Sequence, residues 1–134
     1  GRGSRTVAAE CCHQRRLVWR PVDVLELEWG NLEQSKAAIG HGPYHILLGS
    51  DVTYRPSSHA ALLRTAAWIC DAGHPPARLL LAHHAWGTIS PAARWLGLRD
   101  SKLDHLREAA SLGGWDVQEV DCDKSIVILQ LTRR

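Results

Sequence analysis

Short apolar segments that suit buried strands alternate with segments of helical periodicity, and this alternation constrains the fold most. Residues 45–49 are an apolar run between breakers, and residues 79–82 are fully apolar. Such runs are typical of strands buried on both faces of a sheet. Between them, the stretch after Pro56 carries apolar side chains at helical spacing. Strand–helix–strand alternation predicts an α/β fold with a mainly parallel sheet.

The chain before this region is predicted to hold one strand and a loop. Residues 22–29 alternate apolar and acidic side chains with a period of two, which predicts a half-buried strand. Gly30 ends this strand, and the stretch up to Pro43 is predicted to be loop. The helix after Pro56 is predicted to begin near Ser58, because serine is a favourable N-cap.

A second helix and two strands are predicted in the C-terminal part. Ser101 with Asp104 three positions later indicates a capping box, and Gly113 is predicted to end this helix. Residues 115–120 and 125–131 have the pattern of two strands. The turn between them is so short that the two strands must be antiparallel. The predicted fold is therefore α/β with an antiparallel C-terminal hairpin.

Length and composition exclude several classes of protein. The 134 residues have the size of one domain, and a hydrophobic content of 45% can fill a core. No apolar run approaches the roughly 20 residues that span a bilayer, so no membrane partner is expected. With 16 basic and 14 acidic residues and no basic stripe, no nucleic-acid partner is expected. We expect a single domain with an irregular or helical lead-in over residues 1–20.

The cysteines and the start of the sequence indicate a reducing compartment. Four cysteines lack both the C-x-x-C spacing of zinc sites and the density of a disulfide scaffold; they are Cys11, Cys12, Cys70 and Cys122. No basic-then-apolar leader is found. We therefore expect a cytoplasmic location, with a nuclear location also compatible.

Candidate site residues follow from the rule that ligands bind beyond the carboxyl ends of strands in open α/β sheets. The rule selects residues 28–30, 49–54 and 83–84. Asp51 can accept hydrogen bonds from an amine, and Tyr54 can donate or accept one, so the pair can orient an amine. From the pattern alone, the competing interpretation is favoured, in which Asp51 caps a turn and Tyr54 packs on the following helix.

Trp29 and the histidines each allow two interpretations. An indole at the end of a strand can form an apolar wall for a flat ligand such as adenine, or it can pack in the core. The neighbours His83 and His84, and the pair His41 and His45, suggest a metal site, but zinc needs three or four ligands. Because no third ligand stands at a usual spacing, we expect exposed or hydrogen-bonded imidazoles and no metal.

Two segments together resemble a known enzyme family. Residues 25–30 read Leu-Glu-Leu-Glu-Trp-Gly, and residues 44–54 read Tyr-His-Ile-Leu-Leu-Gly-Ser-Asp-Val-Thr-Tyr. They resemble the seven-strand protein-lysine N-methyltransferases, most closely the methyltransferase-like 21 family and its relatives. These enzymes carry Leu-(Asp/Thr)-Trp-Gly and then Tyr/Phe-Asp-x-Ile-Leu-Gly-Ala-Asp-x-x-Tyr. The resemblance covers residues 21–131.

The resemblance implies methyl transfer from S-adenosylmethionine to a lysine of a client protein, such as a chaperone, an ATPase or a translation factor. By matching positions, Trp29 borders the adenine, and Ser50 stands where the family usually has an alanine against the cofactor. Asp51 and Tyr54 match the family's Asp-x-x-Tyr at the mouth that receives the lysine. The family's strand order, 3-2-1-4-5-7-6, implies that the strand at 125–131 lies beside the strand at 79–82.

The chain also departs from the family pattern. It has neither the glycine-rich loop that cradles the methionine part of the cofactor nor the acidic residue that binds the ribose. The resemblance therefore implies a partial Rossmann-like sheet, the C-terminal half of a methyltransferase, which is inactive by itself. The alternative is a truncated or non-catalytic remnant that acts as a protein-interaction module. A nucleic-acid amine methyltransferase is less favoured, because its Asn/Asp-Pro-Pro-aromatic motif is missing.

Overall fold

The computed structural model describes residues 21–84, 99–123 and 125–134. The predictions for residues 1–20, including Cys11 and Cys12, lie outside these ranges. Within them, no helix is long and apolar enough to cross a bilayer.

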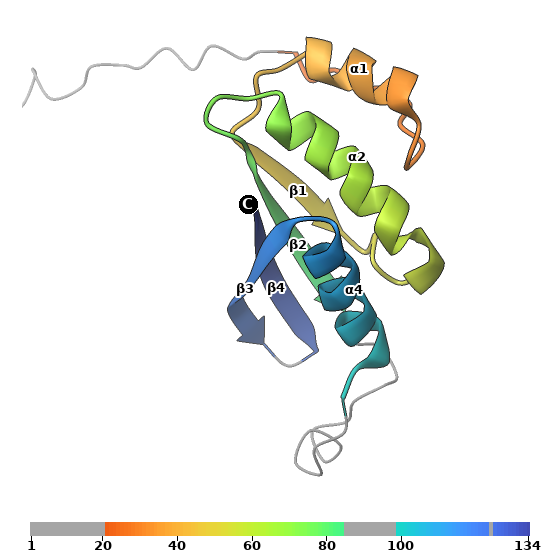
Figure 1. Ribbon diagram of the computed structural model, residues 1–134, viewed down its shortest axis with the longest axis vertical. Coiled ribbons are helices and arrows are strands. Elements are labelled where there is room, and N and C mark those ends of the chain that lie inside the picture. Colours follow the sequence, from red (N-terminus) through yellow and green to blue (C-terminus); the bar gives the residue numbers. More distant parts are fainter. Residues whose placement is uncertain (1–20, 85–98, 124) are drawn as a thin grey trace, which may run out of the picture.

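Four strands form one mixed sheet (Figure 1), namely β1 (Ile46–Ser50), β2 (Arg78–His84), β3 (Trp115–Asp123) and β4 (Ile126–Arg133). Their order is β1-β2-β4-β3. β1 and β2 are parallel, whereas β4 is antiparallel to both of its neighbours. The antiparallel hairpin and the insertion of its second strand beside β2 are therefore confirmed. The expectation of a mainly parallel sheet is wrong for the described residues, because the inserted strand runs against both neighbours.

Helices cover one face of this sheet (Figure 1), with α2 (His59–Asp71) and α4 (Ser101–Leu112) against the strands and α1 (Leu32–Gly40) against α2. A short 3-10 turn, η1 (Pro56–Ser58), leads into α2. Alternate strand residues face the helices and are buried. The core includes Leu63 of α2, Leu106 of α4, and Leu81, Leu129 and Leu131 of the strands.

No helix of the described residues covers the opposite face of the sheet. Leu48 of β1 is 79% exposed on that face, and Ile46 and Ile126 are also exposed. A hollow of about 470 Å³ lies there, lined mainly by Leu48, Leu80, Ala82 and Ile128. An apolar surface of this kind is unusual unless something covers it.

Two predictions for the N-terminal part are wrong. Residues 22–28 have no regular secondary structure, and Val22 and Val24 are 89% and 90% exposed. They pair with no strand of the described residues, although β1 and β3 each have an open edge. The segment predicted as loop contains α1, whose N-cap Asn31 accepts a 3.1 Å hydrogen bond from the backbone N–H of Gln34.

The later helices begin where predicted, but the predicted side chains do not cap them. The side chain of Asp100, rather than the pair Ser101 and Asp104, caps α4 by accepting from two backbone N–H groups. Ser58 is the N-cap of α2, but its side chain makes no capping hydrogen bond. Gly113 ends α4 as predicted.

Candidate functional site

Two of the three predicted places meet at the carboxyl ends of β1 and β2. Ser50 is the last residue of β1, and it lines a cavity of about 280 Å³ together with Asp51 and His84. Asp51 is exposed and has a φ of +56°, in the left-handed region that aspartate tolerates better than most residues. The sheet therefore presents a carboxylate at the edge where α/β proteins bind ligands.

Tyr54 lies at the surface. It is 57% exposed, and the guanidinium of Arg55 lies 5.4 Å from the centre of its ring. Among the described residues, the side chains of Asp51 and Tyr54 make no hydrogen bond. The predicted turn cap at Asp51 is therefore not found in this part of the chain, and the phenol of Tyr54 has no polar partner there.

Trp29 does not line the cavity beside Ser50. It is 39% exposed and lines an apolar cavity of about 180 Å³ with Gly49 and Leu62, on the side of the sheet that α2 covers. Ser50 faces the uncovered side. Trp29 is followed by Gly30, whose N–H donates a 2.7 Å hydrogen bond to Oγ1 of Thr65 in α2. The two predicted cofactor-binding residues thus line different cavities.

A buried polar chain lies directly behind the Asp51–Tyr54 loop. Oγ1 of Thr53 lies 2.7 Å from Nδ1 of His83, and Nε2 of His83 lies 2.9 Å from Oδ2 of Asp100. All three side chains are buried. Oδ1 of Asp100 also accepts from the backbone N–H groups of Lys102 and Leu103. The loop, β2 and the start of α4 are therefore joined by one polar chain.

The direction of the hydrogen bond between His83 and Asp100 follows from the state of Asp100. Burial alone would raise its pKa, but hydrogen bonds from His83 and from two backbone N–H groups outweigh burial and lower it. Asp100 is therefore a carboxylate that accepts from Nε2–H of His83. The other ring nitrogen of His83, Nδ1, is hydrogen-bonded to the hydroxyl of Thr53, which can donate or accept.

His59 holds the backbone of the same threonine. Its Nε2 lies 2.7 Å from the Thr53 carbonyl, which can only accept, so Nε2 carries the hydrogen. Burial lowers the pKa of His59, opposed by that backbone bond and assisted by the nearby His105 and His83. Neutral His59 then accepts at Nδ1 from His105, whose own Nδ1 lies 2.9 Å away.

The order hydroxyl, imidazole, carboxylate in Thr53, His83 and Asp100 is that of a hydrolase triad. Thr53, however, is only 1% exposed, so a substrate has no access to its hydroxyl. The hydrogen-bond network of Thr53, His83 and Asp100 is therefore structural rather than catalytic. The expectation of a hydrogen-bonded imidazole is confirmed for His83, but its two partners were not predicted. The available signal was its position, two residues after Leu81 on the core-facing side of β2, where a polar group must be hydrogen-bonded.

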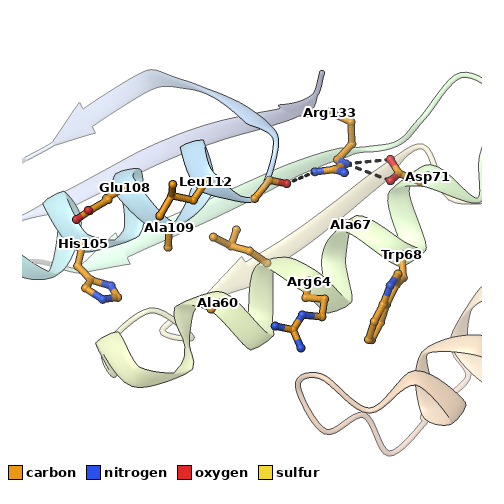
Figure 2. Close-up of a pocket in the computed structure, with 12 residues that line it drawn as sticks. Ala60, Arg64, Ala67, Trp68, Asp71, His105, Glu108, Ala109, Leu112 and Arg133 are labelled. Atoms are coloured by element: carbon orange, nitrogen blue, oxygen red, sulfur yellow. Dashed lines mark hydrogen bonds and ion pairs between the residues drawn. The ribbon is translucent and has the colours of Figure 1, made fainter.

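A separate groove of about 700 Å³ runs between α2 and α4 (Figure 2). Arg64 and Trp68 of α2 line one side of it, and His105 and Glu108 of α4 line the other. At one end Arg133 donates from Nε to Asp71 over 3.0 Å. This groove contains none of the predicted site residues.

Comparison with protein-family models finds no match for the chain, and comparison with curated proteins finds none. Among the described residues, no group of three or more metal-ligating side chains could hold a metal ion.

Proposed function

We propose that the chain is the acceptor-binding half of an S-adenosylmethionine-dependent methyltransferase that modifies a lysine of a non-histone protein. The observation that carries this proposal is the exposed pair Asp51 and Tyr54 at the carboxyl end of β1. Support also comes from the strand order β1-β2-β4-β3, which equals strands 4-5-7-6 of the family that the sequence resembles. By the same resemblance, the client is a chaperone, an ATPase or a translation factor of the cytoplasm or nucleus.

The proposed roles of Asp51 and Tyr54 follow from the chemistry of the acceptor. When bound, S-adenosylmethionine supplies an electrophilic methyl group. A lysine amine has an ordinary pKa near 10.4 and must lose a proton to solvent before it can attack. A nearby carboxylate raises that pKa, so Asp51 serves as an orienting acceptor and not as a base. Tyr54 offers a second polar contact, and the rate gain comes from alignment.

The described residues fit only the adenine end of the cofactor. The cavity beside Trp29 has an apolar wall, but its volume of about 180 Å³ is below the ~300–1000 Å³ of whole small-molecule sites. We therefore expect the isolated chain to bind S-adenosylmethionine weakly or not at all by titration calorimetry. A micromolar dissociation constant for this chain alone would contradict that expectation.

Substitution in the complete enzyme tests the proposal. Asp51→Asn and Tyr54→Phe should each lower turnover of labelled methyl groups more than tenfold, while affinity for S-adenosylmethionine changes little. Asparagine is suitable because it also tolerates the left-handed backbone of Asp51. Glu33→Gln, an exposed acid on α1, is the matched control and should leave turnover unchanged. Turnover within about twofold of wild type for both variants would refute the roles of the pair.

A second candidate is a non-catalytic module that binds a protein through its uncovered sheet face. The observation that favours it is the apolar surface around Leu48. In that case the complete protein neither binds S-adenosylmethionine nor transfers methyl groups. Leu48→Glu would then abolish partner binding, whereas Asp51→Asn would not.

A further inference from the structure

Thr53, which lies between Asp51 and Tyr54, makes two hydrogen bonds to buried side chains. Its hydroxyl is hydrogen-bonded to Nδ1 of His83, and its carbonyl accepts from His59, each over 2.7 Å. Both imidazoles are buried and come from different elements, β2 and α2. Two buried hydrogen bonds on one loop residue restrict both its backbone and its side chain.

The positions of Asp51 and Tyr54 depend on how this loop is attached to the rest of the protein. Asp51 and Tyr54 are exposed, and within the described part of the chain their side chains accept and donate no hydrogen bond. Their positions are therefore set through the backbone, which Thr53 anchors by hydrogen bonds and Val52 by packing against the core. His83 is in turn held by Asp100, whose other oxygen caps α4.

We propose that Thr53, held by His83 and Asp100, is a positioning residue that fixes Asp51 and Tyr54 in the arrangement needed to receive the acceptor amine. The nature of that acceptor rests on the proposed function, whereas the anchoring itself does not. The hydrogen bonds of Thr53 hold the loop against β2 and α4. Because the loop is already ordered, the carboxylate of Asp51 and the phenol of Tyr54 lose little conformational entropy when the acceptor binds.

Backbone order parameters from ¹⁵N relaxation of this chain measure the anchoring without any assay of activity. In the wild type we expect order parameters near 0.85 for residues 51–54, the range of rigid backbone. Thr53→Val keeps the shape but removes the hydroxyl, and should lower these values below about 0.6. Thr53→Ser restores the hydroxyl and should restore the order. Ser35→Ala removes a different buried hydroxyl, on α1, and should leave residues 51–54 unchanged.

If Thr53→Val fails to fold, Asp100→Asn replaces it. Asparagine is also a good N-cap, so this variant keeps α4 while it removes the charge that holds His83, and it should loosen the same segment. Mobile residues 51–54 in the wild type, or equal order in Thr53→Val and Ser35→Ala, would overturn the proposal.

The same variants in the complete enzyme separate this inference from the proposed function. If methyl transfer occurs, Thr53→Val should lower kcat about tenfold without weakening cofactor binding, and Thr53→Ser should recover it. A kcat within twofold of wild type in Thr53→Val would overturn the positioning role. If the wild-type enzyme transfers no methyl group but Thr53→Val still loosens the loop, the proposed function fails and the anchoring stands.

Discussion

The hydroxyl of Thr53 and Nδ1 of His83 are 2.7 Å apart, which joins the loop after β1 to the carboxyl end of β2 inside the protein. Hydrogen bonds between the strand backbones align β1 and β2 only as far as Ser50 and Ala82. The bond between Thr53 and His83 extends that alignment beyond the last backbone pair, to the residues on which the proposed function depends.

Stability should fall as the pH is lowered, in two separate steps. Because the pKa of His59 is lowered in the folded state, the unfolded chain takes up a proton first as the pH falls below about 6.5, and stability decreases. The lowered pKa of Asp100 has the same sign, with its loss below about pH 3.8. Urea midpoints measured from pH 8 to pH 3 should decline below pH 6.5. A midpoint that stays constant between pH 7 and pH 5 would exclude the first step.

The start of α4 can be tested with adjacent alanine substitutions. Asp100→Ala removes the cap and the partner of His83, so it should cost at least about 2 kcal/mol of unfolding free energy. Ser101→Ala should cost less than about 0.5 kcal/mol, since its side chain does not cap the helix. Chemical denaturation of both variants gives the comparison. The reverse ranking would favour the capping box of Ser101 and Asp104.

Two leucines on opposite faces of the sheet should differ strongly in their contribution to stability. Leu129 is fully buried in β4, so Leu129→Ala should cost about 2–5 kcal/mol. Leu48→Ala is the matched control, because Leu48 is exposed on the uncovered face; its cost should stay within about 0.5 kcal/mol. A large cost at Leu48 would mean that another part of the protein covers this face.

Alkylation should distinguish the cysteines of the described residues. Burial raises the pKa of Cys70 to about 11, and its side chain is inaccessible in the core. Cys122 in β3 is exposed. Iodoacetamide at pH 8 should modify Cys122 first and Cys70 only in denaturant, as followed by peptide mass spectrometry. Comparable rates for the two thiols in the native protein would contradict the core position of Cys70.

Elements with local signals could be predicted from the sequence. All four strands, α2 and α4 have apolar periodicity between breakers, and the turn before β4 is short enough to require antiparallel pairing. The prediction of a strand at 22–29 was wrong. Alternation of apolar and acidic side chains shows which side chains a strand would bury, but not whether the segment pairs with another strand. α1 was missed because its short apolar pattern is weak and its main start signal is the side chain of Asn31.

The candidate site was predictable only in part, for a related reason. Ser50, Asp51 and His84 meet because the carboxyl ends of parallel strands lie at one edge of a sheet. The contacts of Thr53 with His83, and of His59 with His105, join residues 30 and 46 positions apart. No local pattern encodes such pairs.

The position of β4 has a consequence for how the protein is made. Residues Ile126–Arg133 come last among the strands, yet they lie between β2 and β3 in the middle of the sheet. A ribosome therefore completes both flanking strands before it supplies the strand that joins them. Until then Leu81 and Trp115 lack their neighbours, and the nascent chain needs protection from aggregation. A premature stop before Ile126 would remove the centre of the sheet rather than an edge.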